Sequence, residues 1–96
     1  MDAHLVEKTR KYETLLAEAL DDTAVRRTGD AQSKKLAQEH IEMAEAYLDD
    51  GRHFMEDDDC VNALASFSYG HGWLDAAIRS DLVESPEDDH RNPRSV

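Results

Sequence analysis

The sequence has little cysteine, no long apolar stretch and no export signal. Its single cysteine, Cys60, excludes an intramolecular disulfide and fits a reducing compartment. No apolar run approaches the roughly 20 residues that a transmembrane helix needs. Residues 1–13, MDAHLVEKTRKYE, lack the apolar core of a signal peptide. We therefore expect a cytoplasmic protein, not bound to a membrane, that forms one small domain.

Basic residues are also scarce. There are 11 Lys and Arg against 22 Asp and Glu, and the formal net charge is −11. Because a nucleic-acid surface needs basic groups, and the basic pairs 26–27 and 34–35 are too small to provide one, nucleic acid is not an expected partner. An acidic surface repels itself in dilute buffer and is tolerated where molar salt shortens the Debye length to about 3 Å. We interpret the composition as that of an extreme halophile; an ordinary acidic protein is the alternative.

Strand-like alternation is absent, and the apolar residues recur with the period of a helix. The pattern predicts three amphipathic helices near residues 3–26, 31–56 and 59–82. Short connections between them predict an all-α, antiparallel up-down-up bundle over residues 1–82. Residues 83–96 hold both prolines of the chain, many charges and little to bury, so we expect a disordered acidic tail.

Residues that favour helix ends support these boundaries. An aspartate that can accept hydrogen bonds from the first helical N–H groups stands before each segment: Asp2, Asp30, and Asp58 or Asp59. Arg26 and Arg27 suit the C-terminus of the first helix, and Gly29 can end it. Gly51 lies on the inner face of the second helix, where a missing side chain lets a neighbouring helix come close.

The third predicted helix is apolar on two sides. One broad face is the expected core: Cys60, Ala63, Leu64, Phe67, Gly70, His71, Leu74, Ala77 and Ile78. A second stripe lies roughly opposite: Asn62, Ser66, Tyr69, Trp73 and Ala76. A helix in a three-helix bundle has only two inner neighbours, so this stripe favours an interaction face. A homodimer is the simplest partner, and another protein is possible; the alternative is that Tyr69 and Trp73 complete the internal core.

The same region carries a family resemblance. The runs AEAYLDDGRHF (44–54) and VNALASFSYGHGWLDA (61–76) resemble a family of short archaeal proteins known as domain of unknown function 357. The resemblance is specific in these runs and looser in the first helix. It implies a three-helix bundle and an archaeal source. It implies no activity, so no catalytic or binding residue is carried over.

Polar groups in the apolar part of the third helix suggest a second kind of site. His71 on the apolar face could act as an acid, a base or a ligand-binding imidazole. We favour a core histidine that is hydrogen-bonded to a tyrosine hydroxyl or to a neighbouring helix. If a pocket exists between the helices, then Tyr69, His71, Trp73 and Asp75 are its expected lining, and a small ligand or a nucleotide is its expected occupant.

Arrangements typical of metal sites and enzymes are missing. Cys60 and His71 are about 16 Å apart along a helix, too far to bind one ion. The acidic run 56–60 lacks the order of a calcium loop, and no glycine-rich phosphate loop precedes a helix. The candidate nucleophiles Ser66, Ser68 and Cys60 have no suitably placed base and acid. We expect no metal, no cofactor and no enzymatic activity. The predicted function is a non-enzymatic interaction or self-association module of a halophilic archaeon.

Overall fold

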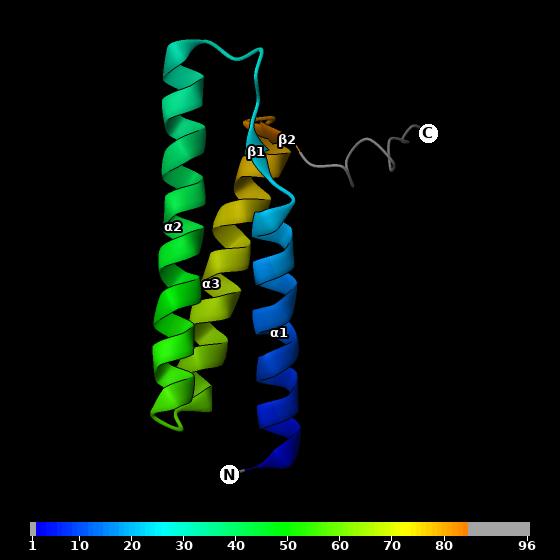
Figure 1. Ribbon diagram of the computed structural model, residues 1–96, viewed down its shortest axis with the longest axis vertical. Helices are drawn as coiled ribbons and strands as arrows, with labels where there is room; N and C mark the ends of the chain where they lie inside the picture. Colours follow the sequence, from blue (N-terminus) through cyan, green and yellow to red (C-terminus); the bar gives the residue numbers. More distant parts are fainter. Residues whose placement is uncertain (1, 85–96) are drawn as a thin grey trace, which may run out of the picture.

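A computed structural model describes residues 2–84 of the chain. It has three helices and two very short strands: α1 (Ala3–Asp21), β1 (Ala24–Val25), α2 (Ala31–Glu56), α3 (Cys60–Arg79) and β2 (Val83–Glu84). Consecutive helices run in opposite directions, and α3 lies behind and between α1 and α2 in the view of Figure 1. The predicted all-α, antiparallel up-down-up bundle is confirmed.

Local hydrogen bonds set the N-terminal end of each helix. An aspartate side chain accepts a backbone N–H in all three: Asp2 from His4 at 2.9 Å, Asp30 from Ser33 at 2.7 Å, and Asp59 from Asn62 at 3.1 Å. The backbone N–H of Ser33 lowers the pKa of Asp30 below its usual value because the bond favours the ionised carboxylate. The bounds predicted for the second helix, 31–56, are those observed.

The predicted end of the first helix is wrong. α1 stops at Asp21, and Ala24–Val25 instead pair with Val83–Glu84 as an antiparallel ladder. The backbone N–H of Arg26 donates to the carbonyl of Leu82 at 3.2 Å, so this arginine extends the ladder and does not end a helix. The helical periodicity could not reveal this, because the partners of these residues lie near the other end of the chain.

The third helix also ends before the predicted residue 82. Asp81 adopts a left-handed conformation with φ 57°, and the N–H of Leu82 donates to the carbonyl of Ala77 at 3.0 Å. These are features of a common helix C-terminus. Val83 is only 1% exposed, so it belongs to the folded domain and not to the predicted tail. The rest of that predicted tail, residues 85–96, lies outside the described residues.

The core is built around α3, which packs most extensively against α2 and also against α1. Its main cluster draws on all three helices: Leu16, Ala44, Leu48, Ala63, Phe67 and Leu74. A β-carbon on Gly70 would lie 2.6 Å from Leu16 Cδ2 and 3.3 Å from the carbonyl oxygen of Ala44. Gly70 therefore allows the close helix approach that its position on the core face predicts.

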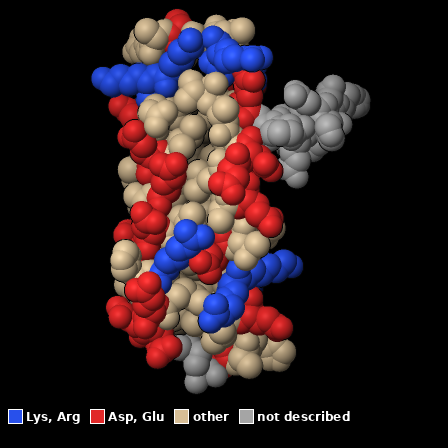
Figure 2. Space-filling model, viewed as in Figure 1, with Lys and Arg blue, Asp and Glu red and all other residues tan. Residues whose placement is uncertain are grey.

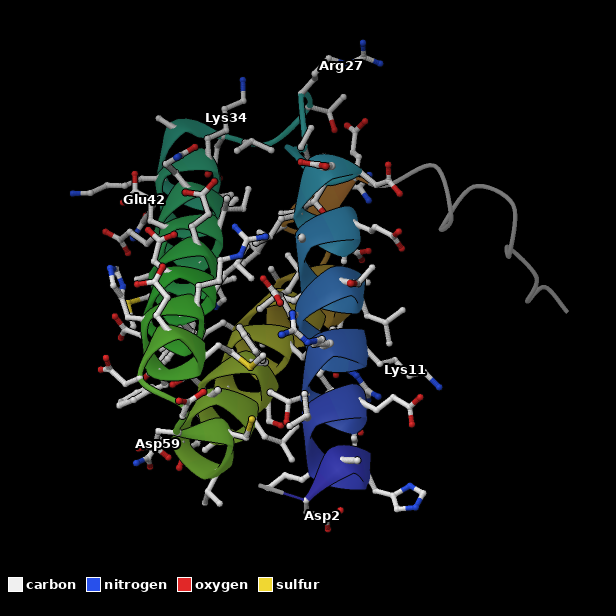
Figure 3. All side chains as sticks on the ribbon, turned by 60° about the horizontal axis from the view of Figure 1, so that its bottom comes forward. Asp2, Lys11, Arg27, Lys34, Glu42 and Asp59 are labelled. Atoms are coloured by element: carbon white, nitrogen blue, oxygen red, sulfur yellow. The ribbon has the colours of Figure 1, made fainter. Side chains whose placement is uncertain are left out.

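Charged side chains project from α1 and α2. Figure 2 shows acidic groups along both helices on the visible face, with a strip between them that is uncharged in its upper part and crossed by basic and acidic groups lower down. Lys11 on α1 and Glu42 on α2 point away from the bundle in Figure 3. One ion pair joins these two helices, from Arg52 Nε to Glu13 Oε2 at 2.8 Å. The visible face is thus typical of a solvated, acidic surface.

Candidate functional site

Four rings line one flank of the α2–α3 pair, which we call the aromatic flank: His40, Tyr47, Tyr69 and Trp73. The imidazole of His40 meets the indole of Trp73 edge-on, with centroids 5.1 Å apart and planes at 77°. Tyr47 and Tyr69 lie 5.5 Å apart with their rings tilted by 46°. Both pairs join α2 to α3, because antiparallel helices bring residues far apart in the sequence to the same level.

A shallow hollow of about 310 Å³ opens on the aromatic flank. Six residues line it: His40, Ser68, Tyr69, Gly72, Trp73 and Ala76. None of these is an Asp, Glu, Lys or Arg, and the lining is mostly apolar. The hollow is suited to an apolar or aromatic group and offers no charged anchor for an ion.

Tyr69 and Trp73 have different surroundings. Trp73 is half-buried and packs against the main core cluster. Tyr69 keeps 63% of its surface exposed although its ring touches Tyr47. The stripe predicted from the sequence is therefore not uniform, since Trp73 contributes to the internal core and Tyr69 projects from it.

The other two members of the predicted interaction face lie outside the hollow. Ser66 is only 7% exposed, so it is buried in the bundle and cannot present a surface. Asn62 is exposed, but its Nδ2 donates to Asp59 Oδ2 at 2.7 Å in the first turn of α3. Of the predicted set, Tyr69 and the outer edge of Trp73 remain for contacts outside the chain.

His71 lies against α1, away from the hollow. Its Nε2 donates a hydrogen bond to the carbonyl oxygen of Tyr12 at 3.2 Å, and the two rings meet edge-on at 5.9 Å. The bond is therefore to a neighbouring helix and not to a tyrosine hydroxyl, and the ring is only partly buried. Asp75 is exposed, and its Oδ2 accepts a bond of 2.8 Å from Arg79 Nε.

The pocket expected around Tyr69, His71 and Trp73 is therefore not formed. His40 takes the place assigned to His71, and sequence reasoning missed it. Nδ1 of His40 donates to the carbonyl of Leu36 at 2.9 Å, which orients the ring. Antiparallel pairing of the two helices about the turn at 57–59 would place residue 40 near the level of Trp73. The sequence therefore contained enough information to place His40 beside this tryptophan.

The exposed side of α3 is uncharged over most of its length. No Asp, Glu, Lys or Arg occurs from Cys60 to Leu74. The exposed positions there are uncharged and mostly small: Val61, Asn62, Ala65, Ser68, Tyr69 and Gly72. A β-carbon on Gly72 would meet nothing within 4 Å. Packing within the chain does not account for this glycine, which costs a helix roughly 1 kcal/mol relative to Ala.

Metal-binding and membrane-spanning features are absent from the part of the chain that the structure describes. Across residues 2–84, no three His, Cys, Asp or Glu side chains gather closely enough to hold a metal ion. Cys60 is a free, buried thiol. None of the helices in this range combines the length and the apolar character that crossing a bilayer requires.

Comparison with known proteins identifies a family. A family model described as "Protein of unknown function (DUF357)" matches residues 11–83. The matched stretch runs from α1 through β2 and so includes the whole α2–α3 pair. Neither the curated proteins nor the solved structures gave a match. Because the match covers well over half of its length, the chain belongs to the DUF357 family.

Proposed function

We propose that this small helical protein is a non-enzymatic interaction module that docks a protein partner on the aromatic flank of α2 and α3. The observation that carries the proposal is Tyr69, which is 63% exposed beside an uncharged hollow in a strongly acidic chain. Exposed aromatic residues are enriched in interfaces, since they bury much apolar area with few rotatable bonds.

The charge distribution supports the same surface. Docking on a carboxylate-covered face would remove ionised groups from water, which is costly unless each is paired. The aromatic flank lets an apolar partner bind without that cost, because no Asp or Glu lines the hollow. A partner with an apolar helix or side chain fits this surface better than a basic partner would.

Catalysis is less well supported. The hollow presents one imidazole, that of His40, and two hydroxyls, those of Ser68 and Tyr69. The Nδ1 atom of that imidazole is engaged by a backbone carbonyl, and no carboxylate lines the hollow to orient a base. A nucleophile, a base and an orienting acid are therefore not assembled there.

A small-ligand site is the second candidate, and the Trp73 edge beside Tyr69 is the observation in its favour. A flat apolar molecule could rest between the two rings. The hollow is shallow, however, whereas ligand sites bury most of a ligand's surface. His71 and Asp75, which would have supplied polar contacts, lie elsewhere.

We further propose an archaeal, halophilic source and a cytoplasmic location. The net charge of −11 on 96 residues supports salt adaptation, since molar salt screens the self-repulsion of such a surface. The single buried cysteine suits a reducing compartment.

Site-specific photocrosslinking in cells tests the docking role. A photoreactive amino acid replaces Tyr69 in one variant and Leu15 in the control; Leu15 is 45% exposed on α1. We expect a discrete protein adduct from position 69 and none from position 15, with the adduct identified by mass spectrometry. Equal labelling from both positions, or none from position 69, would refute the proposal.

A further inference from the structure

Resting on the proposed function, we infer that the partner on the aromatic flank is a second copy of this chain. The two copies meet through antiparallel α3 helices related by a two-fold axis that passes through the hollow. Most symmetric dimers bury the same patch of both subunits, so the patch must be complementary to itself. Three features of α3 meet this requirement.

The first feature is a projection and a hollow on the same face. Tyr69 projects with 63% of its surface exposed, and Gly72, Trp73 and Ala76 line the hollow next to it. With a rise of about 1.5 Å per residue, an axis midway between Tyr69 and Ala76 puts residue 69 of one helix level with residue 76 of the other. Each tyrosine ring then lies level with Ala76 of the other copy, about one helical turn from its Gly72 and Trp73.

The second feature is the open space at Gly72. Both glycines lie close to the proposed axis, and neither carries a β-carbon that would hold the backbones apart. Ser68 and Ala76, one turn on either side, are also small. Within one chain, a β-carbon added at Gly72 would have no packing neighbour. A β-carbon added at Gly51 or Gly70 would lie less than 3 Å from a side chain. The second copy supplies the missing neighbour.

The third feature is the distribution of charge. Two chains of net charge −11 repel each other wherever carboxylates meet. The exposed side of α3 has no charged residue from Cys60 to Leu74, and Asp75 just beyond is paired with Arg79 at 2.8 Å. Two copies can therefore approach here with little direct repulsion, and high salt screens the rest.

The apolar surface extends beyond α3. A standard interface covers about 800 Å² on each partner, which is more than one helix face. Leu36, one turn from His40 on α2, is 44% exposed and adds to the same flank. The Tyr47 ring beside Tyr69 widens it on the other side. The interface is thus centred on α3 and bordered by α2.

Sedimentation equilibrium of the full chain in 2 M KCl tests the inference. We expect the wild-type protein to have twice the 10.9 kDa chain mass. Gly72→Leu fills the hollow but projects into open space in a single chain, so it should keep helicity while raising the dimer dissociation constant about tenfold or more. Tyr69→Ala should weaken the dimer similarly, and Leu15→Ala should not.

A cysteine near the axis gives an independent readout. With a mild oxidant added, Gly72→Cys should form a disulfide-linked dimer and Leu15→Cys should form no disulfide between chains, because only position 72 faces its own equivalent. A monomeric wild-type protein, or a dimer that is indifferent to both Gly72→Leu and Tyr69→Ala, would overturn the inference. If the wild type is monomeric and position 69 still crosslinks to a different protein, the docking role stands without self-association.

Discussion

The ring of Phe67 occupies the space that a side chain on Gly51 would fill. A β-carbon at position 51 would lie 2.7 Å from Phe67 Cζ and closer still to Cε1 and Cδ1. Phe67 is fully buried, and it is among the largest side chains in the core. The α2–α3 contact therefore depends on a glycine in α2 as much as on the phenylalanine in α3.

Gly51→Ala should destabilise the fold. Forcing a methyl group against a packed ring typically costs about 1–3 kcal/mol, and the better helix propensity of Ala returns at most about 1 kcal/mol. We expect a lower midpoint in guanidinium unfolding. Gly72→Ala is the matched control, because its β-carbon meets open space in the single chain; at protein concentrations low enough to exclude association, it should raise the midpoint or leave it unchanged. The same loss in both variants would contradict the packing described here.

The short ladder between β1 and β2 should contribute to stability through Val83. Val83→Ala removes buried methyl groups, since Val83 is 1% exposed, and should cost about 1–3 kcal/mol. Val61→Ala makes the same chemical change at a site that is 69% exposed and should stay within about 0.5 kcal/mol of wild type. Equal thermal midpoints for the two variants would mean that the C-terminal segment does not hold the bundle together.

Replacing Trp73 and replacing Tyr69 should have different effects on the free energy of unfolding. Trp73→Ala removes a half-buried ring from the edge of the core and should lower the free energy of unfolding by about 2–4 kcal/mol. Tyr69→Ala should change it by less than about 1 kcal/mol, measured at protein concentrations low enough to exclude association. A larger loss for Tyr69→Ala would show that this residue serves the internal core.

Salt should stabilise the chain strongly. The net charge of −11 produces self-repulsion that dilute buffer does not screen. We expect the helical circular dichroism signal to melt at a markedly lower temperature in tens of millimolar KCl than in 2 M KCl. Repeating the melt with a neutral osmolyte separates charge screening from general stabilisation. Equal melting temperatures at low and high KCl would argue against salt adaptation.

Asp30 should make part of the stability depend on acid pH. Its bond from Ser33 lowers the pKa in the folded chain below the usual 3.8, so the ionised form stabilises α2. That contribution is present above the unfolded pKa and is lost as the pH falls through the lower folded value. Asp30→Asn keeps a capping side chain without a charge. The wild type should melt at a higher temperature than this variant. The difference in melting temperature should be constant well above pH 3.8 and shrink below it.

Much of the bundle follows from short-range rules. The bounds of α2 could be predicted because its start depends on Asp30 and Ser33, three residues apart, and its length on an unbroken helical period. The broad core face of α3 followed from the same period. In contrast, the end of α1 depends on the pairing of Val25 with Val83, and no local pattern contains that information.

The candidate site also combines features that follow from the local sequence with features that depend on contacts between helices. The sequence predicts an excess of apolar surface on the third helix. It also predicts that this surface contains Tyr69 and Trp73. The exposure of each ring depends on how deeply its side chain packs against α2. The helical pattern of the sequence does not contain this information, so it cannot distinguish Tyr69 from Trp73. His40 joins the hollow only because α2 folds back along α3.

Three helices, their N-terminal caps and the acidic character of the chain could be predicted from short stretches of residues, because helix formation and charge depend on neighbours within a few positions. Which glycine faces a ring and which faces open space depends on how the helices pack. Gly51 and Gly72 look alike in a helical pattern, yet Phe67 fills the space beside Gly51, and the space beside Gly72 is empty. The difference arises from contacts between helices, which depend on distance in space and not on spacing along the chain.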